Sequence, residues 1–186
     1  YLCIGMTCLP PIADPAELDW FLANVVTEEW HFQSDRGRAL AEMVPELKAK
    51  FPHYAPLIDA YRERFDETLP HAVPGTHAIV RRLAERDVAL YALTNFGAEF
   101  WASSRRRWPL FDLFADVVVS GEERVAKPDP AIFDIAERRF GHAPEDLFFT
   151  DDNAANVVAA RARGWHGHLF EGAAGLEVEL ARLGLL

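Results

Sequence analysis

The chain has 186 residues, about the length of one domain or of one domain with an insertion. Its 29 acidic residues outnumber the 19 basic ones, and a net charge of −10 argues against nucleic acid as a partner. Half of the residues are hydrophobic, which excludes a disordered chain. No apolar run approaches the roughly 18 residues of a membrane span, and the only cysteines are Cys3 and Cys8. We therefore expect a cytoplasmic protein with no membrane contact and no disulfide framework.

Residues 15–69 carry helical patterns and no strand pattern. Asp14 followed by Pro15 is typical of a helix start, with an aspartate cap and a proline in the first turn. Apolar side chains then recur at helical spacing in three stripes, over residues 18–26, 40–51 and 57–65. A cap followed by a short helical turn is expected at residues 27–30. This part of the sequence predicts a small helical bundle.

From Pro74 onward, short apolar runs alternate with amphipathic segments. The pattern predicts strands at residues 88–93, 116–120, 147–150 and 166–170, and helices at 75–86, after 95, at 129–140, at 154–163 and at the end of the chain. Residues 1–6 are apolar enough for one more strand. Such alternation is typical of an α/β fold, in which a parallel sheet has helices on both faces.

Ligands of open parallel sheets bind at the carboxyl ends of the strands, so the residues that follow each strand are candidate site residues. Asp151 and Asp152 are adjacent carboxylates at such an end, and their repulsion is offset when they hold a cation such as Mg²⁺. Their alternative role is to cap the next helix. Thr94 and Asn95 offer a hydroxyl, an amide and backbone N–H groups to an anion, or simply an N-cap.

Lys127 lies in a Lys-Pro-Asp-Pro turn, directly before the helix expected at 129–140. The chain otherwise uses arginine, and Lys48 and Lys50 are its only other lysines. A compact ammonium group on a stiff turn suits charge neutralisation at a phosphoryl group. The alternative is a solvated lysine in a loop.

Three segments, taken together, carry a resemblance to a known family. The segments LTNFGAEF (93–100), KPDPAIF (127–133) and FTDDNAANV (149–157) resemble, in this order and spacing, the haloacid dehalogenase-like (HAD) hydrolase superfamily. The resemblance covers nearly the whole chain. It implies a Rossmann-like core formed by residues 1–14 and 73–186, with residues 15–72 as an inserted helical cap.

The resemblance also implies roles for individual residues. Thr94 would bind the transferring phosphoryl oxygen, with help from backbone N–H groups near Asn95, and Lys127 would pair with the nucleophile and the phosphate. Asp152 would bind Mg²⁺ with Asp151 beside it, and Asn156 would steady their loop. Substrate contacts would come from the cap and its surroundings, with Trp30 and Phe96 as candidates.

The first motif of the family, an apolar strand ending in Asp-x-Asp, is absent from this sequence. The first aspartate of that motif is the covalent nucleophile, whereas residues 1–13 contain neither Asp nor Glu. We expect the nucleophile to lie before Tyr1, so that the chain by itself is inactive; the alternative is a member that binds without reacting.

The function implied is that of a Mg²⁺-dependent phosphatase. It would act on a small phosphate ester through an aspartyl-phosphate intermediate, as a monomer or homodimer. A 2-haloacid dehalogenase, which uses an aspartate nucleophile without metal, is the alternative enzyme. A non-catalytic binding protein of the same fold is the alternative outside enzymes.

Overall fold

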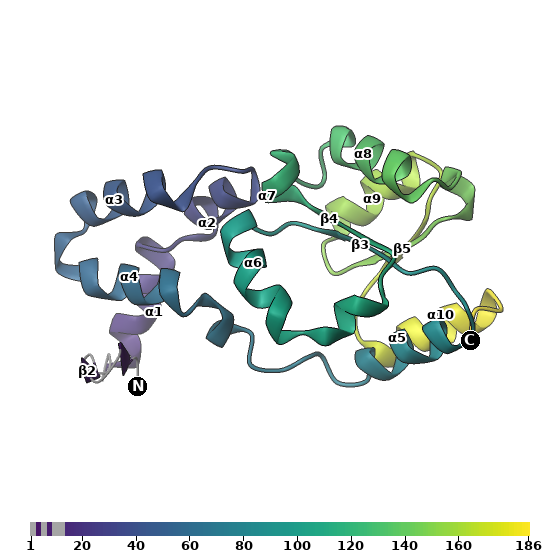
Figure 1. Ribbon diagram of the computed structural model, residues 1–186, viewed down its shortest axis with the longest axis horizontal. Coiled ribbons are helices and arrows are strands. Elements are labelled where there is room, and N and C mark those ends of the chain that lie inside the picture. The colour runs from purple at the N-terminus through teal and green to yellow at the C-terminus, as the bar shows by residue number, and fades with distance from the viewer. Residues whose placement is uncertain (1–2, 5–6, 9–13) are drawn as a thin grey trace.

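The computed structural model describes residues 3–4, 7–8 and 14–186, which form a helical region and an α/β region side by side (Figure 1). The helical region contains α1 (Pro15–Asn24), α2 (Glu28–Asp35), α3 (Leu40–Lys50) and α4 (Ala55–Glu63), with 3₁₀ turns at Pro52–Tyr54 and Phe65–Thr68. The predicted bundle is therefore confirmed over the described residues. No helix in the described ranges is both long and apolar enough to cross a bilayer.

Local signals account for where these helices begin. The Asp14 carboxylate accepts a hydrogen bond from the Ala16 N–H at 2.9 Å, as expected of an N-cap. The Thr27 hydroxyl accepts one from the Trp30 N–H at 3.1 Å. The helix that Thr27 caps extends to Asp35, well beyond the single turn that the sequence predicts.

One hydrophobic core joins the helical region to the α/β region. Its buried members come from helices α1 to α4, from the link between α1 and α2 and from the turn after α4, and Phe100 is contributed by α6 (Ala98–Arg107). They are Phe21, Val25, Val26, Trp30, Leu40, Met43, Val44, Leu47, Ile58, Phe65 and Phe100. Because Phe100 belongs to this core, the helical region packs against α6 of the α/β region.

The α/β region alternates strands and helices, as predicted. Its other elements are α5 (Thr76–Glu85), β3 (Tyr91–Thr94), β4 (Asp116–Val119), α7 (Ser120–Glu123), α8 (Pro130–Phe140), β5 (Phe148–Asp151), α9 (Ala154–Ala162), β6 (His166–Leu169) and α10 (Ala173–Arg182), with 3₁₀ turns at Pro109–Leu113 and Pro144–Asp146. β3 begins three residues later than expected. Val88 and Leu90 pack against the core of α5 and α10 instead.

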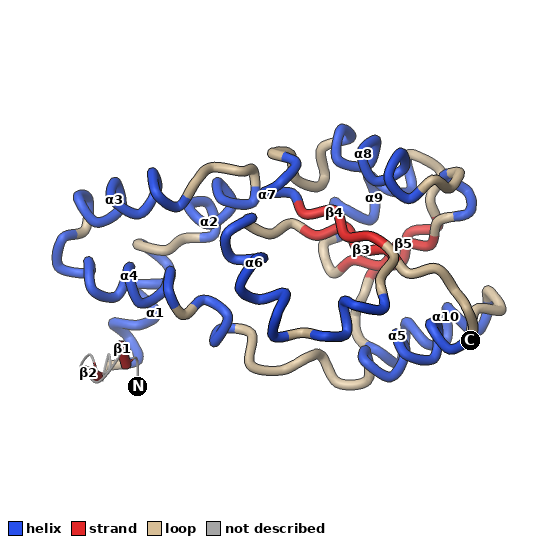
Figure 2. The backbone as a smooth tube through the Cα atoms, in the orientation of Figure 1, coloured by secondary structure: helices blue, strands red, loops and turns tan. Residues whose placement is uncertain are grey.

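The strands form two parallel pairs. β3 pairs with β4 in the register Tyr91↔Asp116 to Thr94↔Val119, and β5 pairs with β6 from Phe148↔His166 to Asp151↔Leu169. The two pairs belong to separate sheets in the described structure. Helices α8 and α9 lie on one side of the strands, and α5 and α10 lie on the other (Figure 2). The fold is thus α/β with parallel strands between two helix layers.

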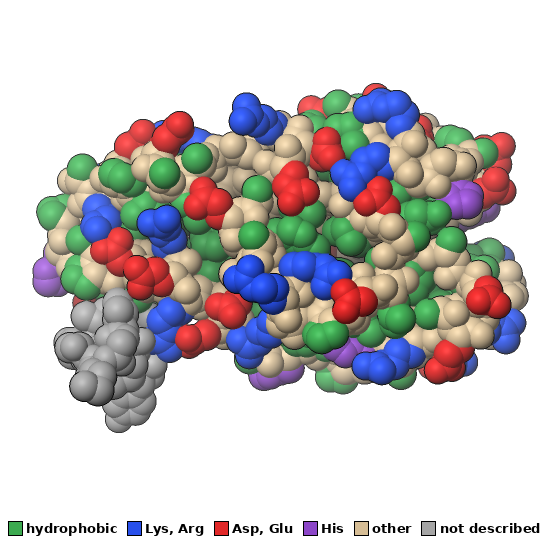
Figure 3. Space-filling model, viewed as in Figure 1, with side chains coloured by type: hydrophobic (Ala, Val, Ile, Leu, Met, Phe, Trp, Pro, Cys, Tyr) green, Lys and Arg blue, Asp and Glu red, His purple; other side chains and the backbone are tan. Residues whose placement is uncertain are grey.

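Each helix layer forms its own core with the strands. Leu93, Val118 and Phe149 pack with α8 and α9, whereas Phe148 packs with α5 and α10. Charged side chains are scattered over the visible outer surface of these layers, and hydrophobic side chains are visible between the layers (Figure 3). The strands are therefore covered on both faces.

A third pair of strands lies apart from the sheet region. β1 (Cys3–Ile4) pairs with β2 (Thr7–Cys8) in antiparallel fashion, near α1 at the end of the helical region (Figure 1). These four residues therefore do not join either parallel pair. The rest of the strand expected at 1–6, and of the core segment expected at 1–14, lies outside the described residues except for Asp14.

Candidate active site

Lys127 is buried at the carboxyl ends of β3 and β5. It is only 6 % exposed, and its Nζ donates to the Asp151 carboxylate and to the Leu93 carbonyl oxygen, both at 2.6 Å. Leu93 directly precedes Thr94, and Asp151 directly precedes Asp152. The three sequence motifs therefore meet at one edge of the strands, and the alternative of a solvated lysine is wrong.

Asn95 fixes the loop that carries Lys127. Its Nδ2 donates to the Lys127 carbonyl oxygen at 2.9 Å, and its Oδ1 accepts from the Lys127 N–H at 2.8 Å. Helix α6 begins at Ala98 and has no side-chain cap, so the alternative of Asn95 as an N-cap is wrong. The side chain of Asn95 positions the lysine, and its amide is fully engaged in doing so.

The two hydrogen bonds between the Asn95 side chain and the Lys127 backbone, here called the Asn95 clamp, predict a measurable loss of stability when they are removed. Replacing Asn95 with alanine removes two hydrogen bonds, each worth about 0.5–1.5 kcal/mol, so the free energy of unfolding should fall by about 1–3 kcal/mol. The matched control is Asn24→Ala, since the exposed Asn24 amide makes only one bond within its own helix, to the Trp20 carbonyl. Urea unfolding followed by circular dichroism measures both, and equal effects would contradict the clamp.

The two adjacent aspartates have different environments. Both oxygens of Asp151 are engaged: Oδ2 accepts from Lys127, and Oδ1 accepts from the Asn153 N–H at 2.8 Å and from Asn156 Nδ2 at 3.0 Å. Asp152 is exposed, and no partner contacts its side chain in the described ranges. The N-cap of α9 is Asn153, whose Oδ1 accepts from the Ala155 N–H at 2.9 Å. Helix capping therefore does not explain the aspartate pair.

The loop after Thr94 is tied to the end of β4 by two residues to which the sequence assigned no role. The Phe96 N–H donates to the Ser120 hydroxyl at 2.9 Å, and the Gly121 N–H donates to the Phe96 carbonyl at 3.1 Å. A Cβ on Gly121 would lie 2.4 Å from the Ala98 nitrogen, so only glycine fits there. The sequence signal for this contact was the position of the two residues: Ser120 ends the strand predicted at 116–120, and Gly121 follows it. The Thr94 hydroxyl makes no hydrogen bond in the described structure and is free for a ligand.

The oxygen atoms at this edge fit a Mg²⁺ ion. Asp152 offers an unpaired carboxylate beside that of Asp151, and the buried Oδ1 of Asn156 has no hydrogen-bond partner. Oxygen-only donors are the ligands that Mg²⁺ prefers. Among the described residues, no three His, Cys, Asp or Glu side chains are grouped closely enough to hold a metal. A complete site at this edge would need a further ligand beyond these two aspartates.

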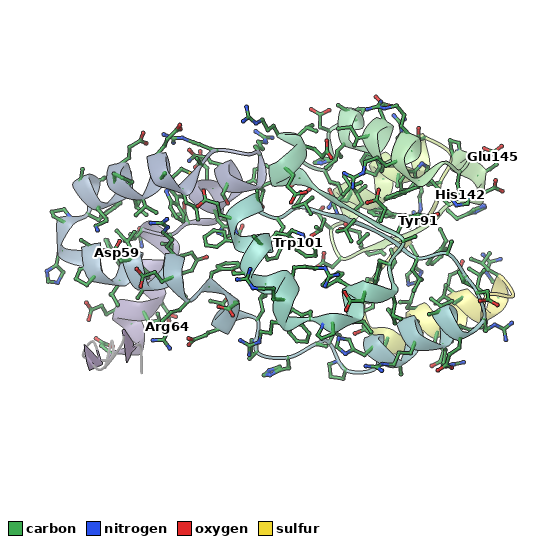
Figure 4. The ribbon with its side chains drawn as sticks, viewed as in Figure 1. Asp59, Arg64, Tyr91, Trp101, His142 and Glu145 are labelled. Carbon is green, nitrogen blue, oxygen red and sulfur yellow. The ribbon has the colours of Figure 1, made fainter. Side chains whose placement is uncertain are left out.

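The two aromatic residues expected at the substrate have different surroundings. Trp30 is 9 % exposed and packs inside the core of the helical region, so its ring serves packing there. Phe96 is partly buried next to Asn95, and its ring contacts those of Phe65 and Trp101 with centroids 5.7 and 5.8 Å apart. Trp101 lies on α6 at the centre of the molecule (Figure 4). Phe96 thus adjoins the candidate site and Trp30 does not contact it.

A buried polar cluster lies where the helical region meets α6. The His31 ring stacks against the rings of Phe65 and Phe100, which also contact each other. Its Nδ1 lies 3.4 Å from the Tyr61 hydroxyl and its Nε2 lies 3.9 Å from the Asp35 carboxylate. Burial raises the pKa of Asp35 to about 6, although a hydrogen bond from the Gly97 backbone opposes this. Burial also lowers the pKa of His31 and raises that of Tyr61 to about 12.

Comparison with known proteins decides the family. A model of haloacid dehalogenase-like hydrolases matches residues 15–164. The chain belongs to this family. It is similar to a sesquiterpene phosphatase of Aspergillus oryzae (31% identity over 90 residues, 48% of this chain and 46% of the relative) and to a phosphoserine phosphatase of Thermus thermophilus (29% over 131 residues, 70% and 45%). This HAD-like hydrolase chain spans about half the length of those relatives.

The fold comparison agrees with this assignment. A HAD family enzyme of Bacteroides thetaiotaomicron, in complex with magnesium, superposes with a TM-score of 0.65. The match has 18% sequence identity and covers 84% of this chain and 82% of that structure. At this identity the likeness establishes the fold of the HAD-like chain, including its parallel strands between helix layers.

Proposed function

We propose that this HAD-like hydrolase chain is the phosphate-binding part of a Mg²⁺-dependent phosphatase that acts on a small phosphate ester. The observation that carries the proposal is the buried ammonium group of Lys127 at the carboxyl edge of β3 and β5, next to Thr94 and the two aspartates. A fixed cation at a strand end suits the charge of a phosphoryl group. Both curated relatives named above are phosphatases, which supports the phosphoryl class.

Each residue at this edge has a distinct part in the proposed reaction. The Thr94 hydroxyl donates to a phosphoryl oxygen, and Lys127 neutralises charge on the phosphate while Asn95 holds its loop. Asp152 would hold the metal ion with Asp151 beside it, and the ion would supply charge neutralisation when bound. Asn156 keeps the Asp151 carboxylate oriented through its bond from Nδ2. Positioning and charge stabilisation account for most of the catalysis of this class of reaction.

The proposed attacking group is an aspartate outside residues 1–186, and the reaction would pass through an aspartyl phosphate. Residues 1–13 contain neither Asp nor Glu. Among the described residues, Asp151 alone pairs with Lys127, and three donors already hold its two oxygens. Asp151 therefore acts as the counter-ion of Lys127. The chain alone should not turn over a phosphate ester, because positioned cations do not replace a nucleophile.

Metal requirement and catalytic turnover distinguish the proposed phosphatase from two alternative functions. A 2-haloacid dehalogenase would need no cation at Asp151 and Asp152, and the exposed unpaired carboxylate of Asp152 favours the phosphatase over it. A non-catalytic binding protein of this fold would bind phosphate and remain inactive in every form of the chain. We also propose a cytoplasmic location and a monomer or homodimer.

The binding half of the proposal is tested with Mg²⁺ and inorganic phosphate, added together and followed by calorimetry. Phosphate should bind the chain only when Mg²⁺ is present, and binding should weaken at least about tenfold in Asp152→Asn, which removes one charged ligand. The matched control is Asp19→Asn, an exposed aspartate on α1 without a partner in the described ranges. Metal-independent phosphate binding, or unchanged binding by Asp152→Asn, would overturn the metal assignment.

The catalytic half is tested by hydrolysis of a generic aryl phosphate in the presence of Mg²⁺. We compare the 186-residue chain with a version extended by the residues encoded before Tyr1. The extended version should hydrolyse the ester and lose this activity in Asp152→Asn, whereas the chain alone should show no turnover above background. Comparable turnover by the two versions would contradict an external nucleophile, and no turnover by either would favour the binding protein.

A further inference from the structure

The loop between β3 and α6 (residues 95–97) is held by two parts of the chain that are far from it in sequence. It directly follows Thr94, the residue proposed to bind a phosphoryl oxygen. Helices α2 and α7 contact each other close to the start of α6, beside this loop (Figure 1). We propose that Ser120 on α7 and Asp35 on α2 are positioning residues, which hold the loop in the conformation that places Thr94 for phosphate. This role rests on the proposed function.

Ser120 holds the loop from the end of β4. Its side chain is completely buried, and the hydroxyl oxygen accepts from the Phe96 N–H at 2.9 Å. The Phe96 carbonyl oxygen accepts from the Gly121 N–H at 3.1 Å. Both backbone groups of Phe96 therefore have partners at the start of α7, which fixes the direction of the chain after Asn95. Water has little access to this buried hydroxyl, so alanine at position 120 would leave the Phe96 N–H without an acceptor.

The helical region contacts the next residue of the loop. The Gly97 N–H donates a hydrogen bond to the Asp35 carboxylate, at the last residue of α2. A Cβ on Gly97 would lie 2.7 Å from the Ser34 Oγ, and Ser34 is itself buried. A side chain at this position of the loop would therefore displace the end of α2. The absence of a side chain lets α2 approach the loop backbone closely enough for the hydrogen bond from Gly97 to form.

The surroundings of Asp35 indicate that the loop is its main partner. Its Oδ1 has no hydrogen-bond partner among the described residues, and His31 Nε2 lies 3.9 Å from it, beyond hydrogen-bond distance. Burial lowers the pKa of His31, so this ring is mostly neutral at pH 7 and offers little charge to the carboxylate. Keeping a carboxylate buried is costly unless it is hydrogen-bonded. The bond from the Gly97 N–H is the contact that offsets this cost.

The loop is thus anchored at each of its three residues before any ligand binds. The anchors lie outside the loop: Lys127 for the first residue, Ser120 for the second and Asp35 for the third. A ligand that binds to an ordered loop does not have to order it, and this preorganisation raises affinity. Without the Ser120 or the Asp35 contact, phosphate would have to order the loop as it binds to Thr94. The helical region therefore contributes to phosphate affinity through a residue that does not touch phosphate.

The test measures binding of inorganic phosphate to the 186-residue chain in the presence of Mg²⁺, by calorimetry, at a temperature at which circular dichroism shows every variant folded. Ser120→Ala and Asp35→Ala should each weaken binding about fivefold, which corresponds to one hydrogen bond. Asp35→Asn should bind within about twofold of the original chain, because an amide oxygen still accepts from the Gly97 N–H. The matched control is Ser104→Ala, which should bind as the original chain does. Ser104 on α6 is 2 % exposed, and its Oγ has no partner in the described ranges.

A titration with Mg²⁺ alone, followed by the amide NMR signal of Asn153, separates positioning from a general loosening of the fold. Mg²⁺ affinity should be the same in Ser120→Ala, Asp35→Ala and the original chain, because the loop supports Thr94 and not the aspartates.

Unchanged phosphate binding in either alanine variant would overturn the proposal. Weaker binding in Ser104→Ala, equal losses in Asp35→Asn and Asp35→Ala, or a parallel loss of Mg²⁺ affinity would assign the effect to the core as a whole, and would overturn it too. A different result, no phosphate binding by the original chain, would refute the proposed function and this role with it.

Discussion

Replacing Asp151 with alanine should lower the free energy of unfolding by about 3–5 kcal/mol, the range measured when one partner of a buried ion pair is removed. The Lys127 and Asp151 side chains are each 7 % exposed, and their charged atoms are 2.6 Å apart. Without the carboxylate, the ammonium group keeps only the Leu93 carbonyl as a partner and stays in a place with little water. The side chain of Asn156 and the Asn153 N–H lose their acceptor as well.

The neighbouring residue supplies the control. Asp152→Ala should change the free energy of unfolding by no more than about 0.5 kcal/mol, because that side chain is exposed and has no partner in the described ranges. Urea unfolding at neutral pH without metal measures both variants. The double variant Lys127→Met with Asp151→Leu should recover most of the loss, since apolar residues can replace a buried ion pair. Equal effects of the two single variants would contradict the burial of the Lys127–Asp151 pair.

The second large effect is a dependence of stability on pH that comes from Asp35. Its pKa rises from 3.8 to about 6 on folding, mainly because the carboxylate is only 8 % exposed and its Oδ1 has no hydrogen-bond partner. The folded state then holds a proton that the unfolded state has released. The free energy of unfolding should therefore fall by about 3 kcal/mol as pH rises from about 4 to about 6, because the pKa shift is about two pH units. Above pH 6 it should stay level.

The variant Asp35→Asn isolates this contribution. An amide keeps the size of the side chain and carries no charge, so the variant should be more stable than the original chain at pH 7.5 by about 2–3 kcal/mol and nearly equal to it at pH 4. His31 and Tyr61, which lie closest to Asp35, are present in both proteins, so their own titration largely cancels in the difference. Urea unfolding at the two pH values measures it. A difference that does not change with pH would contradict the raised pKa.

Local sequence signals determined the elements of this protein. The caps Asp14, Asp129 and Asn153 each accept a hydrogen bond from a backbone N–H two residues later, so a few adjacent residues suffice to start each helix. The alternation of short apolar runs with amphipathic segments predicted the α/β region for a similar reason, because periodicity is a property of one segment. The order of the three motifs then sufficed to place Thr94, Lys127 and the aspartates at one edge of the strands.

Tertiary structure alone decided how those residues are used. The sequence alone does not distinguish Asp151 from Asp152. In the fold, Lys127, 24 residues earlier, pairs with Asp151 as its buried counter-ion, and Asp152 is left exposed. Asn95 likewise holds the Lys127 loop across 32 residues, where its local sequence suggested a helix cap. The pKa of Asp35 depends on burial against a segment some 60 residues away. Burial and charge pairing are set by contacts between distant segments, and those contacts exist only in the folded chain.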